Sequence, residues 1–211
     1  MNAEPKIKLC GMMNPPDVIA AMELGVDYVG FILSEGFRRT IPLGTFCELW
    51  TYLQGSAVKK VGVFVNEPVE NILEYYEEML DVIQLHGQED AQYIGTLRQY
   101  TDKPIIKAFK VASAEDIRMA NRCVADYVLL DSGTGTGKTF DHSLIEAIER
   151  PYFLAGGLTA QNVKEAIRKL HPYAVDASSS LESDGRKDKN KMTEFVHAIR
   201  SLKTDKTALT C

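Results

Sequence analysis

The sequence predicts an α/β protein of a single domain, a (β/α)8 TIM barrel. Eight short apolar runs alternate with amphipathic segments along the chain. The runs are continuous rather than alternating in polarity, which is typical of strands buried on both faces of a parallel sheet. Polar or glycine residues follow nearly every run, and in a barrel the loops after the strands meet at one mouth. An open doubly wound sheet is the alternative. It usually has a glycine fingerprint after its first strand, where this chain has only Gly11.

The strands are expected where the apolar runs lie. The first run, IKLC, ends at Gly11, and the two longest runs are DYVGFIL and VKKVGVFV. The expected strands cover residues 7–10, 27–33, 58–65, 81–85, 104–109, 126–130, 152–155 and 173–176.

Helices are expected between the strands, because apolar residues recur there at helical spacing. Pro15 and Pro16 suit the first turn of the first helix, and Gly25 closes it. Ser113 and Thr159 are expected as N-caps. The expected helices cover residues 17–24, 46–53, 69–79, 91–100, 113–121, 142–149, 160–170 and 191–203. The barrel is expected over residues 1–203 and a polar, fraying tail over 204–211.

The composition limits the class of protein. The 211 residues are 45% hydrophobic, and a chain of this length buries about 70% of its unfolded surface. The net charge is −5 without a basic block, so neither a nucleic acid nor an anionic membrane is expected as a partner. No apolar run is long enough to span a bilayer or to act as a signal peptide. The four cysteines lack CxxC spacing and have no His/Cys cluster around them, which predicts a reduced, cytoplasmic protein without a metal site.

A carboxylate ends the sixth apolar run. Asp131 follows YVLL, and a glycine-threonine loop with Lys138 and Thr139 comes directly after it. At a barrel mouth this places an acid beside a loop that could cover a substrate, although an N-cap or a salt bridge is the plainer role. The loop is not a nucleotide-binding P-loop, because the first glycine of that motif falls on Ser132.

The last two strands are followed by groups that suit an anion. Gly156 and Gly157 follow the seventh run, and Ser178 and Ser179 follow the eighth, which ends at Asp176. Glycines expose backbone N–H groups, and serine hydroxyls and helix N-termini favour a dianion. Each pair alone could be a tight turn or a set of caps. Together, at the positions where barrels often bind phosphate, they predict a phosphate site.

The first strand ends in Cys10, which could be core packing or a general base. A thiol becomes reactive beside a positive charge, and Lys8, Arg38 and Arg39 are candidate sources. One of the two arginines, facing the mouth, could also bind a carboxylate through two hydrogen bonds.

Two further polar residues end strands. His86 is expected to be a structural histidine satisfied by its turn, because no metal-spaced cluster surrounds it. Lys107 is expected in a salt bridge at the mouth. The alternative for Lys107 is a Schiff-base lysine of an aldolase or decarboxylase.

With these residues in view, the chain resembles the phosphoribosylanthranilate isomerases of tryptophan biosynthesis. The likeness runs from the first strand to the last, and the combination of its motifs is specific. They are KLCG at 8–11, GVDYVGFIL at 25–33 with the arginines that follow, VGVFVN at 61–66, VIQLHGQED at 82–90, VLLDSGTGTGKTFD at 128–141, LAGGLTAQNV at 154–163 and VDASS at 175–179.

The resemblance implies an Amadori rearrangement of N-(5-phosphoribosyl)anthranilate to 1-(2-carboxyphenylamino)-1-deoxyribulose 5-phosphate. Asp131 matches the family's acid, which protonates the ribose ring oxygen, and Cys10 matches the base, which removes the proton from ribose C2. Arg39 matches the arginine that binds the anthranilate carboxylate. The phosphate-binding residues implied are Gly156, Gly157, Asp176, Ser178 and Ser179. No metal or organic cofactor is implied, because the substrate nitrogen serves as the electron sink.

Two other functions suit such a barrel. One is a different sugar-phosphate isomerase, such as the histidine-pathway Amadori enzyme, but that site resembles a pair of aspartates and Cys10 argues against it. The other is a catalytically silent barrel that binds a phosphate ligand, against which the Cys10 and Asp131 pair argues. The expected partner is a small-molecule substrate, and the expected assembly is a monomer or a homodimer.

Overall fold

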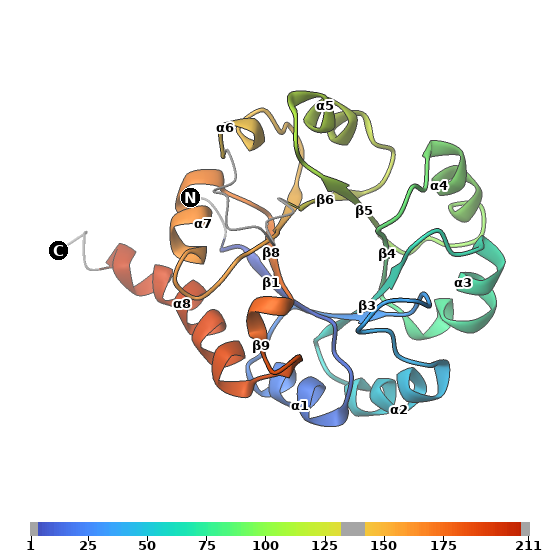
Figure 1. Cartoon of the computed structure of the whole chain (residues 1–211), viewed down its shortest axis with the longest axis horizontal. Coiled ribbons are helices and arrows are strands. Elements are labelled where there is room, and N and C mark those ends of the chain that lie inside the picture. Colours follow the sequence, from blue (N-terminus) through green and yellow to red (C-terminus); the bar gives the residue numbers. More distant parts are fainter. Residues whose placement is uncertain (1–3, 132–141, 208–211) are drawn as a thin grey trace.

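Eight parallel strands close into a barrel that is surrounded by helices (Figure 1). The structure is a computed structural model that describes residues 4–131 and 142–207, without the side chains of 142, 143 and 203–207. The barrel strands are β1 (Lys6–Cys10), β2 (Tyr28–Ile32), β3 (Lys59–Phe64), β4 (Val82–Leu85), β5 (Ile105–Lys110), β6 (Tyr127–Asp131), β7 (Tyr152–Ala155) and β8 (Ala174–Ala177). The helices are α1 (Pro15–Glu23), α2 (Leu43–Leu53), α3 (Val69–Tyr75), α4 (Ala91–Leu97), α5 (Ala114–Arg122), α6 (His142–Ile145), α7 (Val163–Leu170) and α8 (Lys189–Thr207), with 3-10 turns η1 (Glu77–Met79) and η2 (Ser179–Leu181).

The predicted barrel and its eight strand-helix pairs are confirmed, with most boundaries displaced by a few residues. The N-cap at Ser113 is also confirmed, because its side chain and that of Asp116 form a capping box at the start of α5. The predicted loop over 132–141, with Lys138 and Thr139, lies outside the described residues.

The start of α7 differs from the prediction. Thr159 is not its N-cap, because α7 begins at Val163 after Asn162. The Asn162 side chain accepts a hydrogen bond from Thr159 N and donates one to Gly157 O, at 2.8 and 2.9 Å. These bonds hold residues 157–162 in a turn that the apolar periodicity does not reveal.

Two differences concern the C-terminal part. The helix α8 continues to Thr207, so the first four residues of the expected tail, 204–207, are helical. The polar link before it contains an unexpected antiparallel hairpin of β9 (Glu182–Ser183) and β10 (Arg186–Lys187). Its two turn residues, Asp184 and Gly185, have φ values of +50° and +78°, and a two-residue hairpin turn with positive φ at both positions matches the twist of its strands.

The interior of the barrel is filled by alternate residues of the strands. Because side chains of a strand alternate between its two faces, every second residue points inward. The inward residues that form the buried apolar layers are Tyr28, Val61, Val82, Ile106, Ala108, Leu129, Phe153, Ala155 and Ala174. A second, larger apolar core lies between the barrel and the helices. Side chains therefore fill the interior of the barrel, and a ligand can bind only at the mouth of the barrel.

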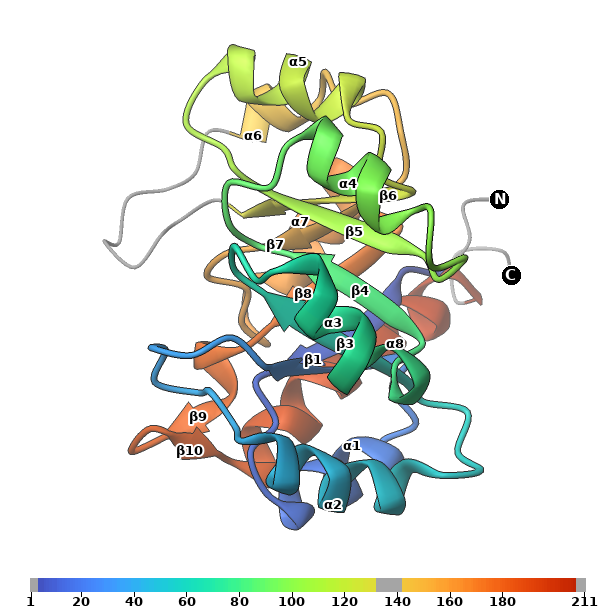
Figure 2. The same cartoon turned by 90° about the vertical axis from the view of Figure 1, so that its right-hand side faces the viewer.

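The barrel closes between its first and last strands. β1 pairs in parallel with β8, with Lys8 opposite Asp176. The β9–β10 hairpin follows β8 at the mouth and lies beside the loop between β2 and α2 (Figure 2). No helix in the described part of the chain is long and apolar enough to cross a membrane.

Candidate active site

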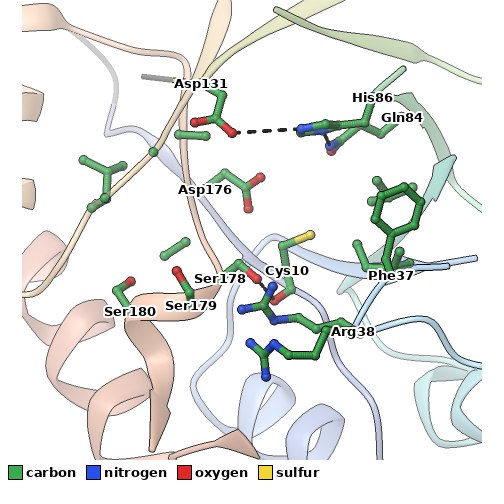
Figure 3. Close-up of a pocket in the computed structure, with 18 of the residues that line it drawn as sticks. Cys10, Phe37, Arg38, Gln84, His86, Asp131, Asp176, Ser178, Ser179 and Ser180 are labelled. Atoms are coloured by element: carbon green, nitrogen blue, oxygen red, sulfur yellow. Dashed lines mark hydrogen bonds and ion pairs between the residues drawn. The ribbon is translucent and has the colours of Figure 1, made fainter. Parts of the chain in front are cut away.

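A cavity of about 570 Å³ opens at the carboxyl ends of the strands (Figure 3). All the residues that the sequence nominated for the site line it, and they come from five different loops and strand ends. They are Cys10, Arg39, Asp131, Gly156, Gly157, Asp176, Ser178 and Ser179. A volume of this size accommodates a sugar phosphate joined to an aromatic ring.

Alternation along the strands explains why these residues meet. Val82 belongs to the apolar layer inside the barrel, so Gln84 and His86, two and four residues later, also point inward. By the same count Ala174 leads to Asp176 on β8 and to Ser178 directly after the strand. The polar side chains of the cavity thus occupy the same inward-facing series of strand positions as the apolar side chains of the interior.

The Cys10 thiol is buried beside the Lys8 ammonium. Lys8 is fully buried, and its Nζ lies 2.8 Å from Asp176 Oδ2. Gly30 on the neighbouring strand makes room for both groups. A Cβ at that position would lie 2.6 Å from Cys10 Sγ and 3.2 Å from Lys8 Nζ.

Burial raises the pKa of the Cys10 thiol above its ordinary value, although the nearby ammonium groups of Lys8 and Lys187 act in the opposite direction. Burial also acts to lower the pKa of Lys8, but the Asp176 carboxylate and Cys10 outweigh it and the pKa is raised. Lys8 is therefore a permanent cation beside a thiol that is mostly protonated at neutral pH. Burial therefore makes Cys10 harder to ionise than a free thiol, despite the positive charge beside it.

Asp131 faces His86 across the cavity, with 4.0 Å between Asp131 Oδ2 and His86 Nε2 (Figure 3). The other ring nitrogen, Nδ1, lies 3.0 Å from Gln84 Nε2. Burial lowers the pKa of His86, so the ring is neutral at neutral pH. The backbone N–H of His86 donates to Phe64 O at 2.8 Å, as expected for its turn. The side chain also lines the cavity, so the turn satisfies the backbone of His86 while its ring faces the site. The structural role expected for this histidine stays a prediction.

Two buried oxygen atoms in the cavity have no partner among the described residues. They are Gln84 Oε1 and Asp176 Oδ1. A buried acceptor without a hydrogen bond costs about 1–3 kcal/mol, so a polar ligand or water that donates to these atoms stabilises the site. Both residues line the cavity together with Cys10 and Asp131, and an acceptor oxygen suits a sugar hydroxyl.

The loops after β7 and β8 form one side of the cavity. Gly156 and Gly157 have φ values of +90° and +65°, which favour glycine and turn the chain sharply after β7. Ser178 Oγ donates to Cys10 O at 3.0 Å, so this loop also fixes the end of β1. Ser179 and Ser180 continue the same edge. These backbone and hydroxyl groups are suited to an anion, as the sequence predicted.

The arginines lie beside the serine loop, since a Cβ at Gly11 would meet both Arg39 Cδ and Ser178 Oγ, and both arginines already bind a carboxylate of the chain. Arg39 Nε lies 2.5 Å from Glu182 Oε1, and Arg39 Nη2 lies 3.1 Å from Glu182 Oε2. Arg38 Nη2 shares Oε2 at 2.5 Å. The sequence nominated Arg39 to bind a carboxylate and did not reveal this internal partner.

Lys107 does not reach the cavity. Ile106 and Ala108 point into the barrel, so Lys107 between them points out. Its Nζ lies 2.9 Å from Glu89 Oε2 and donates to Gly87 O at 2.7 Å. The salt bridge expected for Lys107 is confirmed, and its orientation argues against a Schiff-base lysine. Over residues 4–131 and 142–207, no group of His, Cys, Asp and Glu side chains is arranged to hold a metal ion.

Comparisons with known proteins agree with the geometry. The model of the N-(5'phosphoribosyl)anthranilate (PRA) isomerase family matches residues 7–198. The chain belongs to the phosphoribosylanthranilate isomerase family. A relative of that name from Endomicrobium trichonymphae is 40% identical over 204 residues, which are 94% of this chain and 100% of the relative.

Solved structures of the phosphoribosylanthranilate isomerase family superpose on the whole barrel. One is a family member in complex with reduced 1-(o-carboxyphenylamino)-1-deoxyribulose 5-phosphate, with a TM-score of 0.81 and 32% identity over 93% of this chain and 99% of that one. Another shows monomers generated from the dimeric enzyme of Thermotoga maritima, with the same TM-score of 0.81, 32% identity and 93% and 99% coverage.

Sequence reasoning missed one polar residue that lines the cavity of this isomerase-family protein, Gln84, and two that contact its lining residues, Glu182 and Lys187. Gln84 was hidden in an apolar run, and only counting alternate positions from His86 could have found it. Glu182 and Lys187 lie in a charged link whose strands are two residues long and give no pattern. The signal present was the Asp184-Gly185 pair, which is typical of a hairpin turn.

Proposed function

We propose that the chain performs its isomerase reaction, the Amadori rearrangement of N-(5-phosphoribosyl)anthranilate, by general acid/base catalysis with Asp131 as the acid and Cys10 as the base. The observation that carries this proposal is that a carboxyl group and a thiol from opposite sides of the barrel, β6 and β1, face one cavity. Between them lies room for a single sugar. An acid and a base on two sides of one sugar are what ring opening and proton transfer from C2 require.

The charged groups of the cavity suggest how the substrate lies. The phosphate binds to Gly156, Gly157, Ser178 and Ser179, and the anthranilate carboxylate binds to Arg39. Asp176, which the resemblance groups with the phosphate residues, is left out of this set because its carboxylate pairs with Lys8. The ribose then spans the middle, beside the unpartnered oxygens of Gln84 and Asp176. Contacts at the two charged ends hold the reacting carbon in place, which is how binding energy is used for catalysis.

Asp131 delivers a proton to the ribose ring oxygen, the C1–O bond breaks, and a protonated imine forms between C1 and the anthranilate nitrogen. His86, neutral because burial lowers its pKa, offers Nε2 towards the carboxyl group and helps to keep it in place.

The Cys10 thiolate then takes the proton from C2, and the electron pair of the C2–H bond moves into the imine to give an enolamine. That enolamine tautomerises to the ketose product. Lys8 stabilises the thiolate by its charge. The substrate nitrogen receives the electrons, so the proposed mechanism needs no metal or organic cofactor. Activity that survives exhaustive dialysis against a chelator is the expected result.

A fluorescence assay tests the roles of the two residues. Freshly generated substrate should lose its anthranilate fluorescence with the wild type and keep it with Cys10→Ser and Asp131→Asn. Each variant should lose about a hundredfold or more in rate, the effect of removing a positioned acid or base. Glu23→Gln, at an exposed ion pair with Lys189, is the matched control and should keep full activity. Undiminished turnover by Cys10→Ser would overturn the base assignment, and undiminished turnover by Asp131→Asn would overturn the acid assignment.

We further propose a cytoplasmic location and a monomer or homodimer as the working form. The cysteines Cys10, Cys47 and Cys123 are free thiols, which suits a reducing compartment. The dimeric enzyme of Thermotoga maritima supports the homodimer, and light scattering of the purified protein decides between the two states.

A further inference from the structure

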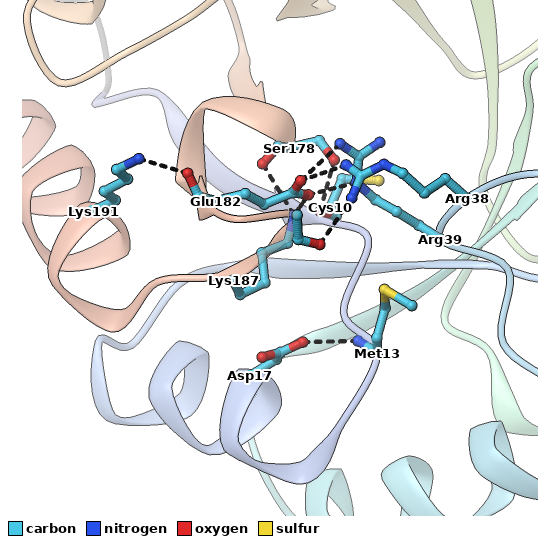
Figure 4. Close-up of polar contacts among 10 residues, drawn as sticks. Cys10, Met13, Asp17, Arg38, Arg39, Ser178, Glu182, Lys187 and Lys191 are labelled. Atoms are coloured by element: carbon cyan, nitrogen blue, oxygen red, sulfur yellow. Dashed lines mark hydrogen bonds and ion pairs between the residues drawn. The ribbon is translucent and has the colours of Figure 1, made fainter.

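One carboxylate in the site is surrounded by three cations. The Glu182 side chain is only 6% exposed, and it faces Arg38, Arg39 and Lys187 (Figure 4). Burial alone would raise the pKa of Glu182, but hydrogen bonds from Arg39, Arg38 and Lys187 outweigh it and lower the pKa to about 2. Glu182 is therefore always charged, and the cluster as a whole remains positive towards the cavity.

The contacts of Arg39 leave one edge of its guanidinium for a ligand. Nε and one N–H of Nη2 are directed at the two oxygens of Glu182. The Nη1 group has no hydrogen-bond partner in the described part of the chain, so the edge formed by Nη1 and Nη2 can donate two parallel bonds to a second carboxylate. The stem is also fixed, because it crosses Gly11. A Cβ there would lie 2.6 Å from Arg39 Cδ.

The Glu182 carboxylate also connects Arg39 to the loop that contains Ser178. Lys187 Nζ lies 2.9 Å from Glu182 Oε1 and donates to Ser178 O at 3.0 Å. The Lys187 side chain is 2% exposed, so this connection is dry and rigid. Arg38 donates from Nη1 to Gly185 O at 2.8 Å and thereby holds the hairpin against the arginine loop. Glu182 thus accepts hydrogen bonds from the arginines of the loop after β2 and from Lys187 of the hairpin after β8, which are far apart in the sequence.

We infer that Glu182 is a positioning residue that selects for a carboxylate on the substrate. It holds the Arg39 guanidinium with one edge towards the cavity, and through Lys187 it fixes the distance between the carboxylate-binding and phosphate-binding sides. This inference rests on the proposed function, because it assumes that Arg39 receives the anthranilate carboxylate. The β9–β10 hairpin, on this basis, exists to deliver Glu182 to the mouth.

Two ligands separate this role from a structural one. The first is reduced 1-(o-carboxyphenylamino)-1-deoxyribulose 5-phosphate, and the second is the same compound without the carboxylate. Calorimetry gives their dissociation constants for the wild type and for Glu182→Gln. The variant should bind the first ligand about 10 to 100-fold more weakly, the range for a lost charge-assisted contact. It should bind the second within about threefold of the wild type, since that ligand makes no contact with Arg39.

A double-mutant cycle shows whether Glu182 acts through Arg39. If it does, Glu182→Gln added to Arg39→Met causes little further loss of affinity for the carboxylated ligand. Asp81→Asn is the matched control, because Asp81 pairs with Lys60 at 2.7 Å outside the cavity. It should leave both dissociation constants unchanged. Thermal melting reports whether each variant folds, and Glu182→Asp, which keeps the charge, replaces Glu182→Gln if that variant does not. Glu182→Asp should show the same selective loss with a smaller magnitude.

The outcomes are distinct. Equal weakening of both ligands in folded Glu182→Gln, or no weakening of either, overturns the inference, and so does a wild type that does not prefer the carboxylated ligand. Failure of the wild type to convert phosphoribosylanthranilate overturns the proposed function. In that case a selective loss of the carboxylated ligand would still uphold the role of Glu182.

Discussion

The position of the Cys10 thiol depends on the absence of a side chain at Gly30 on the neighbouring strand. Gly30 has no side chain, and the space above its Cα is occupied by Cys10 Sγ and Lys8 Nζ. Both groups are held by the barrel, so neither can move away freely when that space is filled. The position of the proposed base, Cys10, is therefore set by Gly30, which takes no part in the reaction.

Gly30→Ala should lower kcat/KM by at least about tenfold, since an added Cβ would displace the thiol and a small displacement in a positioned pair costs that much or more. Gly44→Ala is the control, because a Cβ at Gly44 in α2 meets no atom within 4 Å. The control should keep full activity and gain about 0.5–1 kcal/mol in the free energy of unfolding. Unchanged kinetics in Gly30→Ala would show that the thiol position tolerates the shift.

The Cys10 thiol of the wild type should lose its proton at a higher pH than a free thiol. Burial raises the pKa of Cys10, and the ammonium groups of Lys8 and Lys187 do not offset this effect. The thiolate absorbance of the wild type, minus that of Cys10→Ser, should therefore develop only above the ordinary thiol value of about 8.5. Thiolate absorbance that is complete at pH 7 would contradict this expectation.

At the scale of elements, the pairing of β1 with β8 closes the barrel and also places charged residues beside the proposed base. The pair of Lys8 and Asp176 joins the two strands inside the barrel, and neither side chain is exposed by more than 8%. Removing one partner of a buried pair leaves the other charge uncompensated, whereas replacing both with apolar side chains restores a neutral interior. Stability and catalysis should therefore respond differently to the two changes.

Lys8→Met should lower the free energy of unfolding by about 3–5 kcal/mol, and Lys8→Met with Asp176→Leu should recover most of that loss. The double variant should remain inactive, because it has lost the cation beside the thiol. Lys6→Met is the matched control on the same strand. Its exposed pair with Asp27 should be worth less than about 1 kcal/mol in urea denaturation. Recovery of activity in the double variant would exclude a role for Lys8 in catalysis.

At the scale of the whole molecule, an aromatic layer that stabilises the fold lies at one end of the barrel, and the residues proposed for catalysis lie at the other end. The aromatic layer of Tyr28, Tyr127, Phe153 and Tyr173 fills the interior at the end opposite the mouth. Its rings pack at centroid distances of 5.0–5.8 Å. None of these side chains lines the cavity.

Phe153→Ala should therefore cost about 3–5 kcal/mol in the free energy of unfolding, because it leaves a cavity in the interior layer. The KM of the folded fraction, measured well below the melting temperature, should stay within about twofold, since the charged contacts at the mouth are retained. Tyr100→Ala, at a side chain that is 66% exposed, should change the free energy of unfolding by less than about 0.5 kcal/mol. A large rise in KM for Phe153→Ala would show that the two ends are coupled.

The parts of the molecule that repeat were predictable, and those that depend on one local contact were not. Eight apolar runs determine the barrel, and strand alternation then places Cys10, Asp131 and Asp176 at one mouth. Thr159 is not the N-cap because the residues after it form a turn that its own side chain and that of Asn162 hold, and the helix begins only at Val163. The turn at His86 was predictable, but the direction of its ring into the cavity was not. The hairpin that carries Glu182 was missed because strands of two residues produce no periodicity.

The position of β1 has a consequence for how the protein is made. Cys10 and Lys8 leave the ribosome well before Asp176, Ser178 and Glu182, which follow them in the chain. The strand that pairs with β1 on its other side is β8, so the nascent chain carries the thiol without the Asp176 carboxylate until the barrel closes. The proposed site is thus assembled only when β8 pairs with β1.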